Sequence, residues 1–252
     1  MIWNLELGGH TAVITGGTRN IGLAIAKGLQ HHGAAVCIVG GSDSSALGRA
    51  LAELGGEGAA VTGLLASVDD EHDVARIFDH AEARLGPVSI LVNGAANRPD
   101  TPLIELSRAQ WQKVIDVVLT GAFLTSQQLF RRLPEDRRGA IVNLGGLGAH
   151  RPKIDRPHVI AAKSGLVGLT RALAEEGIGR VRVNCVVPGT IETERKPGQS
   201  NPTASEQGGH AWLAPPRMWH VWYCRSPIPT TTMSPGKRST SMAAGTCPEA
   251  IR

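Results

Sequence analysis

The chain has 252 residues, 42% of them hydrophobic and 19% charged, which is ordinary for one large folded domain with a substantial core. The formal net charge is +4, but the basic residues are scattered along the chain, so a nucleic-acid-binding stripe is not expected. No run of about 18 apolar residues is present, and no basic segment is followed by a long apolar one. We therefore expect neither a membrane span nor a signal peptide.

The four cysteines are spread along the chain as Cys37, Cys185, Cys224 and Cys247. None forms a close C-x-x-C pair, so the sequence indicates no metal site and no disulfide framework. Free thiols of this kind suit a reducing compartment, and we expect a cytoplasmic protein.

Short apolar runs are expected to form strands at Thr11–Thr15, Ala35–Val39, Ile90–Asn93, Ala140–Leu144 and Val181–Val187. They are apolar throughout, which is typical of parallel strands covered on both faces. Helical patterns accompany them at Ile21–His32, Ser44–Leu54, Asp70–Leu85, Ala109–Leu133 and Val159–Glu176. The alternation predicts an α/β fold, a single doubly wound parallel sheet of the Rossmann type that occupies residues 1–196.

The composition changes after about Lys196. Residues 197–252 are dense in Pro, Thr, Ser and Gly, and they show neither a strand period nor a helix period. Three of the five tryptophans, Trp212, Trp219 and Trp222, fall within this part. We expect an irregular tail, either disordered or aberrant, after the folded domain.

A glycine-rich loop joins the first expected strand to the first expected helix. Glycine there allows the backbone to approach a pyrophosphate, and the start of the helix offers free N–H groups and a positive dipole end. Because the loop lies at a strand–helix junction of a βαβ pattern, it predicts a dinucleotide site rather than a plain turn. The residues predicted to bind are Thr15, Gly16, Gly17, Thr18, Arg19, Asn20, Ile21 and Gly22.

This loop resembles the T-G-x-x-x-G-x-G motif of the short-chain dehydrogenase/reductase family, with Asn20 in place of the middle glycine. Asn tolerates a left-handed backbone better than most residues. The resemblance, to the classical 3-oxoacyl-ACP-reductase-like members, runs from about Leu5 to Thr193. It implies that Asn93, Gly94 and Ala95 lie beside the adenosine ribose. It also implies that the segment containing Pro188, Gly189, Ile191 and Thr193 holds the nicotinamide carboxamide.

The end of the second expected strand bears on the choice of dinucleotide. NAD-binding members of such folds place an acidic residue there for the ribose 2′-hydroxyl, but this chain has Gly40, Gly41 and Ser42, with no carboxylate before Asp43. Arg19 stands where NADP-preferring relatives often carry Arg, whose fork suits a 2′-phosphate. We predict NADP as the preferred cofactor, with Ser42 beside it. NAD is the alternative if Arg19 is only a solvated loop residue.

The family's mechanism needs Tyr and Lys four residues apart on one helix, a Ser before them, and an Asn on the preceding long helix. Lys163 matches the lysine and is the one tetrad residue retained. The Tyr, Ser and Asn positions fall on Val159, Gly146 and Val118, none of which can transfer a proton. The only tyrosine of the chain is Tyr223, in the tail.

A replacement acid or base is sought among nearby residues. His158 adjoins the lost tyrosine position, but one residue along a helix turns a side chain by about 100°. His150 and Asp155 are more simply explained as polar loop residues. Lys163 is expected to bind the ribose hydroxyls, as the resemblance implies.

Two functions follow from these residues. The first is an NAD(P)-dependent oxidoreductase with impaired catalysis, acting on a small carbonyl or alcohol substrate. The alternative is a catalytically inactive dinucleotide-binding protein of the same fold. A third possibility, a basic protein that binds an acidic partner, is disfavoured by the scattered charge.

The family normally ends with a helix, a last strand and a V-N-G-G motif, which this tail lacks. Read one base out of frame, with permitted choices at degenerate positions, Arg217–Pro248 encodes a segment that resembles that ending. We hypothesise a frame change near Thr203–Gly209, the alternative being a divergent tail; sequencing the encoding DNA decides between them. Loss of the last strand would expose a sheet edge and puts in doubt the homo-oligomer usual in the family.

Overall fold

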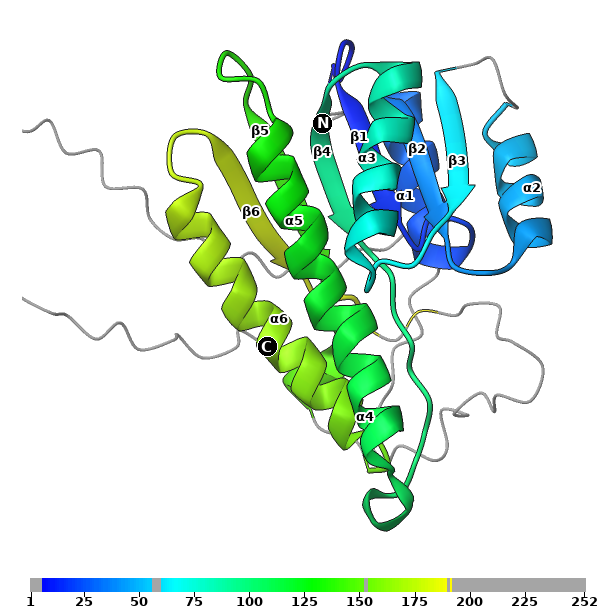
Figure 1. Ribbon diagram of the computed structural model, residues 1–252, viewed down its shortest axis with the longest axis vertical. Coiled ribbons are helices and arrows are strands. Elements are labelled where there is room, and N and C mark those ends of the chain that lie inside the picture. The colour runs from blue at the N-terminus through cyan, green and yellow to red at the C-terminus, as the bar shows by residue number, and fades with distance from the viewer. Residues whose placement is uncertain (1–5, 56–59, 152–153, 190, 192–252) are drawn as a thin grey trace, which may run out of the picture.

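The computed structural model describes residues 6–55, 60–151, 154–189 and 191. They form a six-stranded parallel sheet in the order β3-β2-β1-β4-β5-β6, which confirms the predicted doubly wound fold (Figure 1). The strands are β1 (Thr11–Thr15), β2 (Ala35–Gly40), β3 (Val61–Leu65), β4 (Val88–Asn93), β5 (Gly139–Leu144) and β6 (Val181–Val186).

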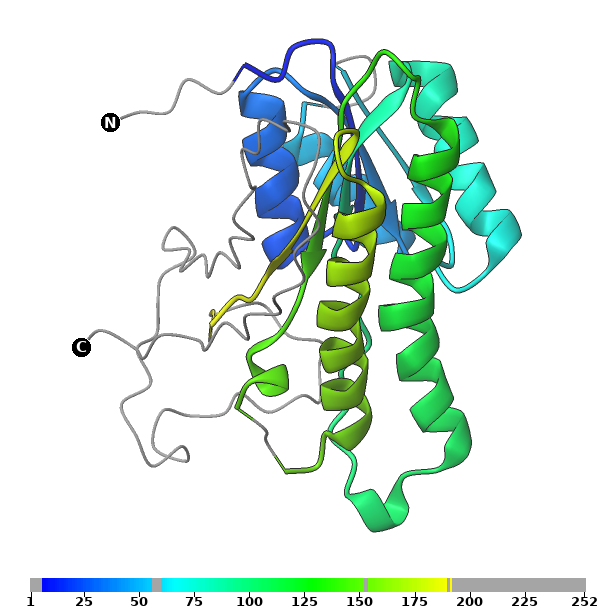
Figure 2. The same ribbon diagram turned by 90° about the vertical axis from the view of Figure 1, so that its left-hand side faces the viewer.

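Helices cover both faces of this sheet, as its apolar strands require. The helices are α1 (Asn20–His31), α2 (Ser44–Glu53), α3 (Glu71–Leu85), α4 (Arg108–Ile115), α5 (Gly121–Arg132) and α6 (Pro157–Glu176). Figure 2 shows α1 on one side of the sheet and α3 and α5 on the other. Alternate residues of β1 feed the two cores: Val13 packs with the α3, α5 and α6 side chains, whereas Ala12 and Ile14 pack with those of α1 and α2.

Two elements differ from the sequence-based expectation. Strand β3 was not expected, because Gly63 interrupts its short apolar run; a Cβ on Gly63 would lie only 2.8 Å from Ile38 Cγ1. The single long helix expected over Ala109–Leu133 is divided into α4 and α5 by a π-helical turn at Asp116–Thr120. Such turns are frequent at functional sites, and a long apolar periodicity does not reveal them.

The order of the strands places the site. The winding direction reverses between β1 and β4, and in folds of this kind ligands bind beyond the carboxyl ends of the strands at such a switch point. The register sets Thr15 beside Asn93, and Asn93 beside Asn143, so three polar side chains lie in a row at those ends.

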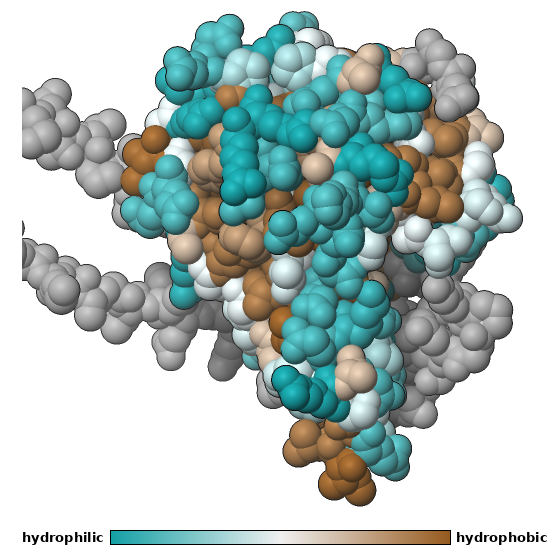
Figure 3. Space-filling model, viewed as in Figure 1, coloured by the Kyte–Doolittle hydropathy of each residue, from teal (hydrophilic) through white to brown (hydrophobic). Residues whose placement is uncertain are grey.

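The surface over α3 and α5 is mostly hydrophilic, whereas an apolar tip lies at the lower end of the molecule (Figure 3). Among the exposed apolar side chains are Leu103 and Ile104, which are 71% and 94% exposed in the short helix η1 (Leu103–Glu105). Within the described ranges, none of the helices combines the length and the apolar character needed to cross a bilayer.

The expected C-terminal boundary of the folded domain, at residue 196, lies outside the described residues. Strand β6 forms one edge of the sheet within the described residues. The expected tail at 197–252 and the hypothesised frame change near Thr203–Gly209 fall outside the described residues.

Candidate dinucleotide-binding and catalytic site

The glycine loop between β1 and α1 is packed so closely that side chains are excluded. Gly16 has a φ of 69°, and a Cβ there would lie 2.8 Å from the carbonyl oxygen of Gly94. A Cβ on Gly22 would overlap the carbonyl oxygen of Gly16. Asn20 adopts a φ of 50°, so the Asn in place of the family's middle glycine has a left-handed backbone. The loop therefore keeps the close backbone geometry of a glycine motif.

The N-terminus of α1 faces this loop. Within the described chain no side chain caps it, and its first turn contains no acidic residue. The first N–H groups of a helix lack intrahelical acceptors and carry the positive end of the helix dipole. A tight loop and an uncapped helix start together fit the pyrophosphate of a dinucleotide.

Arg19 and Asp43 meet at the far side of the loop. Arg19 Nη2 lies 3.1 Å from Asp43 Oδ2 in an ion pair between the start of α1 and the start of α2. Ser42 is exposed beside them. The structure thus brings Arg19 close to the carboxylate that follows β2, a pairing that the sequence analysis did not foresee.

The residues after β4 are tied to β1 and to the buried interior. The backbone N–H groups of Gly94 and Ala95 donate to Thr15 Oγ1 at 3.1 and 3.2 Å. Asn93 Nδ2 donates to Asn143 Oδ1 at 2.8 Å, and Thr125 Oγ1 donates to Asn93 Oδ1 at 2.7 Å. This buried network fixes the floor of the site across the switch point.

Lys163 lies on α6 with only 6% of its surface exposed. Its Nζ donates a hydrogen bond to the carbonyl oxygen of Leu144, at the end of β5. Burial, and then the positive charge of Arg98, lowers the pKa of Lys163 from 10.5 to about 8. A buried amine with this pKa carries its proton less firmly than an exposed lysine.

The three altered tetrad positions carry no polar side chain, and two of them share one buried cluster. Val118, in the π-helical turn, and Val159, on α6, belong to one buried cluster with Val114 and Ala162. Gly146 lies against the stem of Lys163, since a Cβ built on it would be 3.4 Å from Lys163 Cγ. The structure thus brings the four positions to one place, where Lys163 supplies the only titratable side chain among them.

The secondary candidates are less well placed for proton transfer. His158 is fully buried, burial lowers its pKa, and neither ring nitrogen has a hydrogen-bond partner within the described segments. His150 is exposed. Asp155 has a φ of 61°, and its backbone carbonyl accepts a hydrogen bond from Thr101 N at 2.7 Å. None of these observations links the three side chains to Lys163.

The segment expected to hold the nicotinamide carboxamide follows β6. Pro188 and Ile191 are partly buried, whereas Gly189 is exposed, and a Cβ built on it would meet nothing within 4 Å. Thr193 lies outside the described residues. The described groups of His, Cys, Asp and Glu include no cluster of three or more that could hold a metal ion.

Comparison with known proteins agrees with this geometry. The family model for short chain dehydrogenases matches residues 10–203, and the chain belongs to this family of oxidoreductases, whose members use NAD or NADP. The match ends close to the point where the composition of the chain changes.

The similar proteins include two reductases and an alcohol dehydrogenase. A 3-oxoacyl-[acyl-carrier-protein] reductase from Chlamydia muridarum is 32% identical over 204 residues, covering 81% of this chain and 82% of the relative. An acetoacetyl-CoA reductase from Paracoccus denitrificans is 35% identical over 185 residues, covering 73% and 74%. The crystal structure of a short-chain alcohol dehydrogenase from Sinorhizobium meliloti superposes with a TM-score of 0.71, at 32% identity, over 77% of each chain.

Proposed function

We propose that this chain binds NADP(H) in preference to NAD(H) and is an oxidoreductase of strongly reduced turnover, acting on a small carbonyl or alcohol substrate. The observation that carries the binding claim is the intact cradle, in which the glycine loop packs against Gly94 beside the uncapped start of α1. Arg19 supports the preference, because its guanidinium lies at the end of the site that follows β2.

The bound cofactor supplies or accepts a hydride at its nicotinamide ring. The loop residues from Thr15 to Gly22 hold the pyrophosphate, and Asn93, Gly94 and Ala95 form the floor beside the adenosine ribose. Pro188, Gly189, Ile191 and Thr193 are proposed to orient the carboxamide, as the family resemblance implies. Lys163 is proposed to bind the ribose hydroxyls.

Reduced turnover follows from the residues around Lys163. When a hydride reaches a carbonyl carbon, the oxygen must gain a proton, and general acid catalysis of such a step contributes about 10²–10⁴-fold. Val118, Gly146 and Val159 offer no proton. With a pKa of about 8, Lys163 is the remaining group that could exchange one.

The second candidate function is dinucleotide binding without turnover. It is favoured by the apolar packing of Val118 and Val159, which leaves no polar group where the family's Asn and Tyr stand. The two candidates share the same bound cofactor and differ only in whether a carbonyl is reduced.

The first experiment is a titration of the purified protein with NADPH and with NADH, followed by nicotinamide fluorescence. Micromolar binding with NADPH tighter than NADH is the expected result, and no binding of either would refute the proposal. Turnover is then measured by NADPH oxidation with acetoacetyl-CoA, because two of the relatives are named for β-keto thioesters. A rate that Lys163→Ala abolishes supports the weak oxidoreductase, and no rate supports the inactive binder.

A further inference from the structure

The amine of Lys163 has fewer hydrogen-bond acceptors than its charged form can use. An ammonium group carries three N–H donors and no acceptor. Within the part of the chain that the structure describes, Nζ has one partner, the carbonyl oxygen of Leu144, and no carboxylate forms an ion pair with it. Because only 6% of Lys163 is exposed, a positive charge there is poorly solvated. The environment therefore favours a neutral or singly donating nitrogen.

The space beside the Lys163 side chain is left open by Gly146. The atoms nearest to a Cβ built on Gly146 are Cγ, Cδ and Cε of Lys163, at 3.4, 3.7 and 3.9 Å. Gly146 thus places no side chain of its own over the stem of the lysine. Val159 precedes Lys163 by four residues, so the two lie on the same face of α6, and valine offers the amine no hydrogen bond.

Two further groups act on the charge of Lys163. Burial has the largest effect on its pKa, and the positive charge of Arg98, on the loop after β4, lowers it further, whereas Cys185 on β6 acts in the opposite sense. The resulting pKa is about 8, so about half of the amine is neutral at pH 8. An exposed lysine of ordinary pKa is neutral in only about 0.3% of molecules at that pH. A neutral, desolvated lysine beside a second cation is the form in which this residue attacks carbonyl compounds.

We infer that Lys163 is a nucleophile that condenses with a small ketone or aldehyde, admitted beside Gly146, to form an imine. This covalent activity goes beyond the proposed hydride transfer and does not require a bound dinucleotide. The burial of the amine, its single acceptor and the uncovered stem support the assignment.

The condensation needs no oxidant and no reductant. The nitrogen lone pair forms a bond to the carbonyl carbon, the π pair moves to the oxygen, and a proton passes from nitrogen to oxygen. The C–O bond then breaks as the nitrogen forms C=N, and the hydroxyl leaves as water with a proton from solvent. The protonated imine retains one N–H donor, which the carbonyl oxygen of Leu144 can accept. The product thus matches the one acceptor that the structure provides.

The test is reductive trapping of the purified full chain with acetone and cyanoborohydride at pH 8. Cyanoborohydride reduces an imine to a stable secondary amine, and peptide mass spectrometry gives the rate at each lysine. Lys27 and Lys113 serve as internal references, because their side chains are 48% and 56% exposed and each pairs with a carboxylate. We expect Lys163 to be modified at least about 10-fold faster than either. Accessibility alone predicts the opposite order, and faster modification of the exposed lysines would overturn the inference.

A matched pair of variants tests the space beside the lysine. Gly146→Ala places a methyl group against the stem of Lys163, whereas Gly148→Ala, in the same loop, places one 3.5 Å from Ile160 Cγ1. Gly146→Ala should slow trapping at Lys163 relative to Lys27 by several-fold, and Gly148→Ala should leave this ratio unchanged. If Gly146→Ala does not slow it more than Gly148→Ala, the inference is wrong. Gly146→Ser replaces the alanine variant if circular dichroism shows that the latter does not fold.

The pH dependence of trapping gives an independent measurement. In the native chain the rate at Lys163 should rise with pH to a midpoint near 8. Arg98→Gln removes a charge that lowers the pKa of Lys163, so the midpoint should move to higher pH. A native midpoint close to 10.5, or one that Arg98→Gln does not raise, would contradict the assigned environment of the amine.

The dinucleotide titration keeps this inference separate from the proposed function. If neither NADPH nor NADH binds while Lys163 is trapped first, the proposed function fails and the inference stands. If NADPH binds while the exposed lysines are trapped first, the inference fails and the binding proposal stands.

Discussion

The two ends of the site depend on different parts of the chain. At the cofactor end the shape is made mainly by backbone. The glycine loop packs against Gly94, and the N–H groups of Gly94 and Ala95 donate to one side-chain hydroxyl, that of Thr15. At the catalytic end the backbone elements are present, but the side chains on them are Val118, Gly146 and Val159.

The difference shows which features of a site are coupled to folding. The glycine loop lies within the packing of β1, α1 and β4, so a change there disturbs the fold as well as the cofactor. The catalytic positions are filled by apolar or absent side chains that suit a buried environment, so their chemistry can be lost without cost to the core. The proposed function, cofactor binding with a weakened reaction, is consistent with this difference between the two ends.

Restoring the missing side chains should give the largest effect. The combined changes Val159→Tyr, Gly146→Ser and Val118→Asn should raise carbonyl reduction by about 10²–10⁴-fold, because they supply the proton donor and its partners. Gly146→Ser fits without a clash, since its nearest neighbour, Lys163 Cγ, lies at an ordinary contact distance of 3.4 Å. NADPH oxidation with acetoacetyl-CoA measures the gain.

The control for this restoration is the same variant with Lys163→Ala, which should lose most of the gain. If the restored variant folds and binds NADPH but reduces acetoacetyl-CoA no faster, the three side chains are not sufficient for catalysis in this site.

Changing a glycine of the loop should affect binding and stability together. Gly22→Ala places a methyl group on the carbonyl oxygen of Gly16, so it should destabilise the fold by about 3 kcal/mol and abolish NADPH binding. Denaturant unfolding and the NADPH titration measure the two effects. Gly28→Ala on the same helix has open space, and should raise stability by about 0.5–1 kcal/mol with binding unchanged. Equal behaviour of the two variants would contradict the packing argument.

The buried Lys163 should make stability depend on pH. Its folded pKa of about 8 is below the ordinary 10.5, so the folded state binds fewer protons than the unfolded state between these values. The free energy of unfolding contributed by this group is therefore lowest below pH 8 and rises as the pH approaches 10.5.

Lys163→Met removes this dependence. The free energy of unfolding of the variant, minus that of the native chain, should be larger at pH 7 than at pH 10.5. The expected change is about 3 kcal/mol, because the pKa is lowered from 10.5 to about 8. Urea unfolding of both proteins at the two pH values measures it. A relative stability that does not vary with pH would mean that the lysine is solvated in the folded protein.

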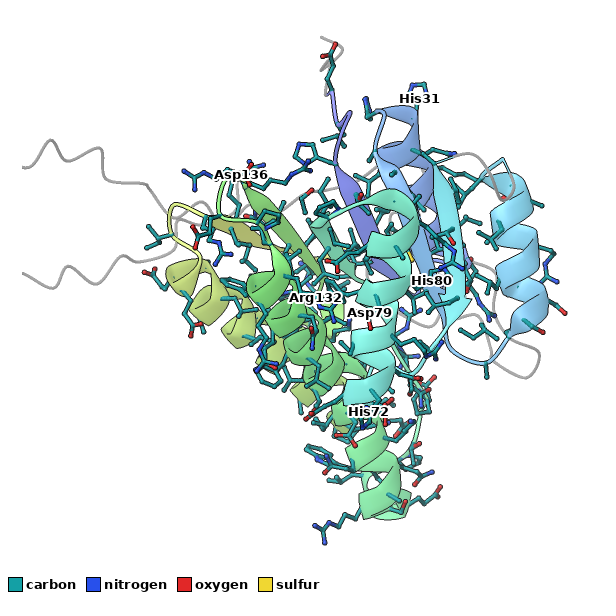
Figure 4. All side chains as sticks on the ribbon, turned by 45° about the horizontal axis from the view of Figure 1, so that its top comes forward. His31, His72, Asp79, His80, Arg132 and Asp136 are labelled. Atoms are coloured by element: carbon teal, nitrogen blue, oxygen red, sulfur yellow. The ribbon has the colours of Figure 1, made fainter. Side chains whose placement is uncertain are left out.

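A smaller change in the free energy of unfolding is expected from a substitution away from the site, at the contact between α5 and α3 (Figure 4). Arg132 Nη1 lies 2.6 Å from Asp79 Oδ1 and 3.0 Å from Glu82 Oε2, and the guanidinium lies 5.9 Å from the centre of the Phe78 ring. Arg132→Ala should lower the free energy of unfolding by about 1 kcal/mol, because these pairs are partly exposed. NADPH affinity should stay the same; a changed affinity would show that α3 and α5 act on the cofactor end.

Most of the fold was predictable because its signals are local. The βαβ pattern can be read from short stretches of sequence. These are the apolar runs of β1 and β4 and the glycines at helix ends. Strand β3 was missed because Gly63 interrupts its apolar run. The reason for a glycine at this position is the close approach of Ile38 on the adjacent strand, which the local sequence does not show.

The candidate site was predictable where it depends on motifs, and not where it depends on contacts between distant residues. The glycine loop and the position of Lys163 follow from spacing. The ion pair of Arg19 with Asp43 joins two loops that the sheet brings together. The lowered pKa of Lys163 depends on burial by several elements at once, and it could not be read from the helix that carries it.

The hydrogen bonds to Thr15 have a consequence for how quickly two backbone amides of the site exchange their hydrogens with solvent. Amide hydrogens in loops ordinarily exchange with solvent quickly, but those of Gly94 and Ala95 are held by the side chain of β1. We expect them to exchange only when β1 and β4 separate, at a rate close to that of the sheet itself. The dinucleotide proposed to bind here would then meet a floor that is already ordered, so little conformational entropy would be lost in ordering it.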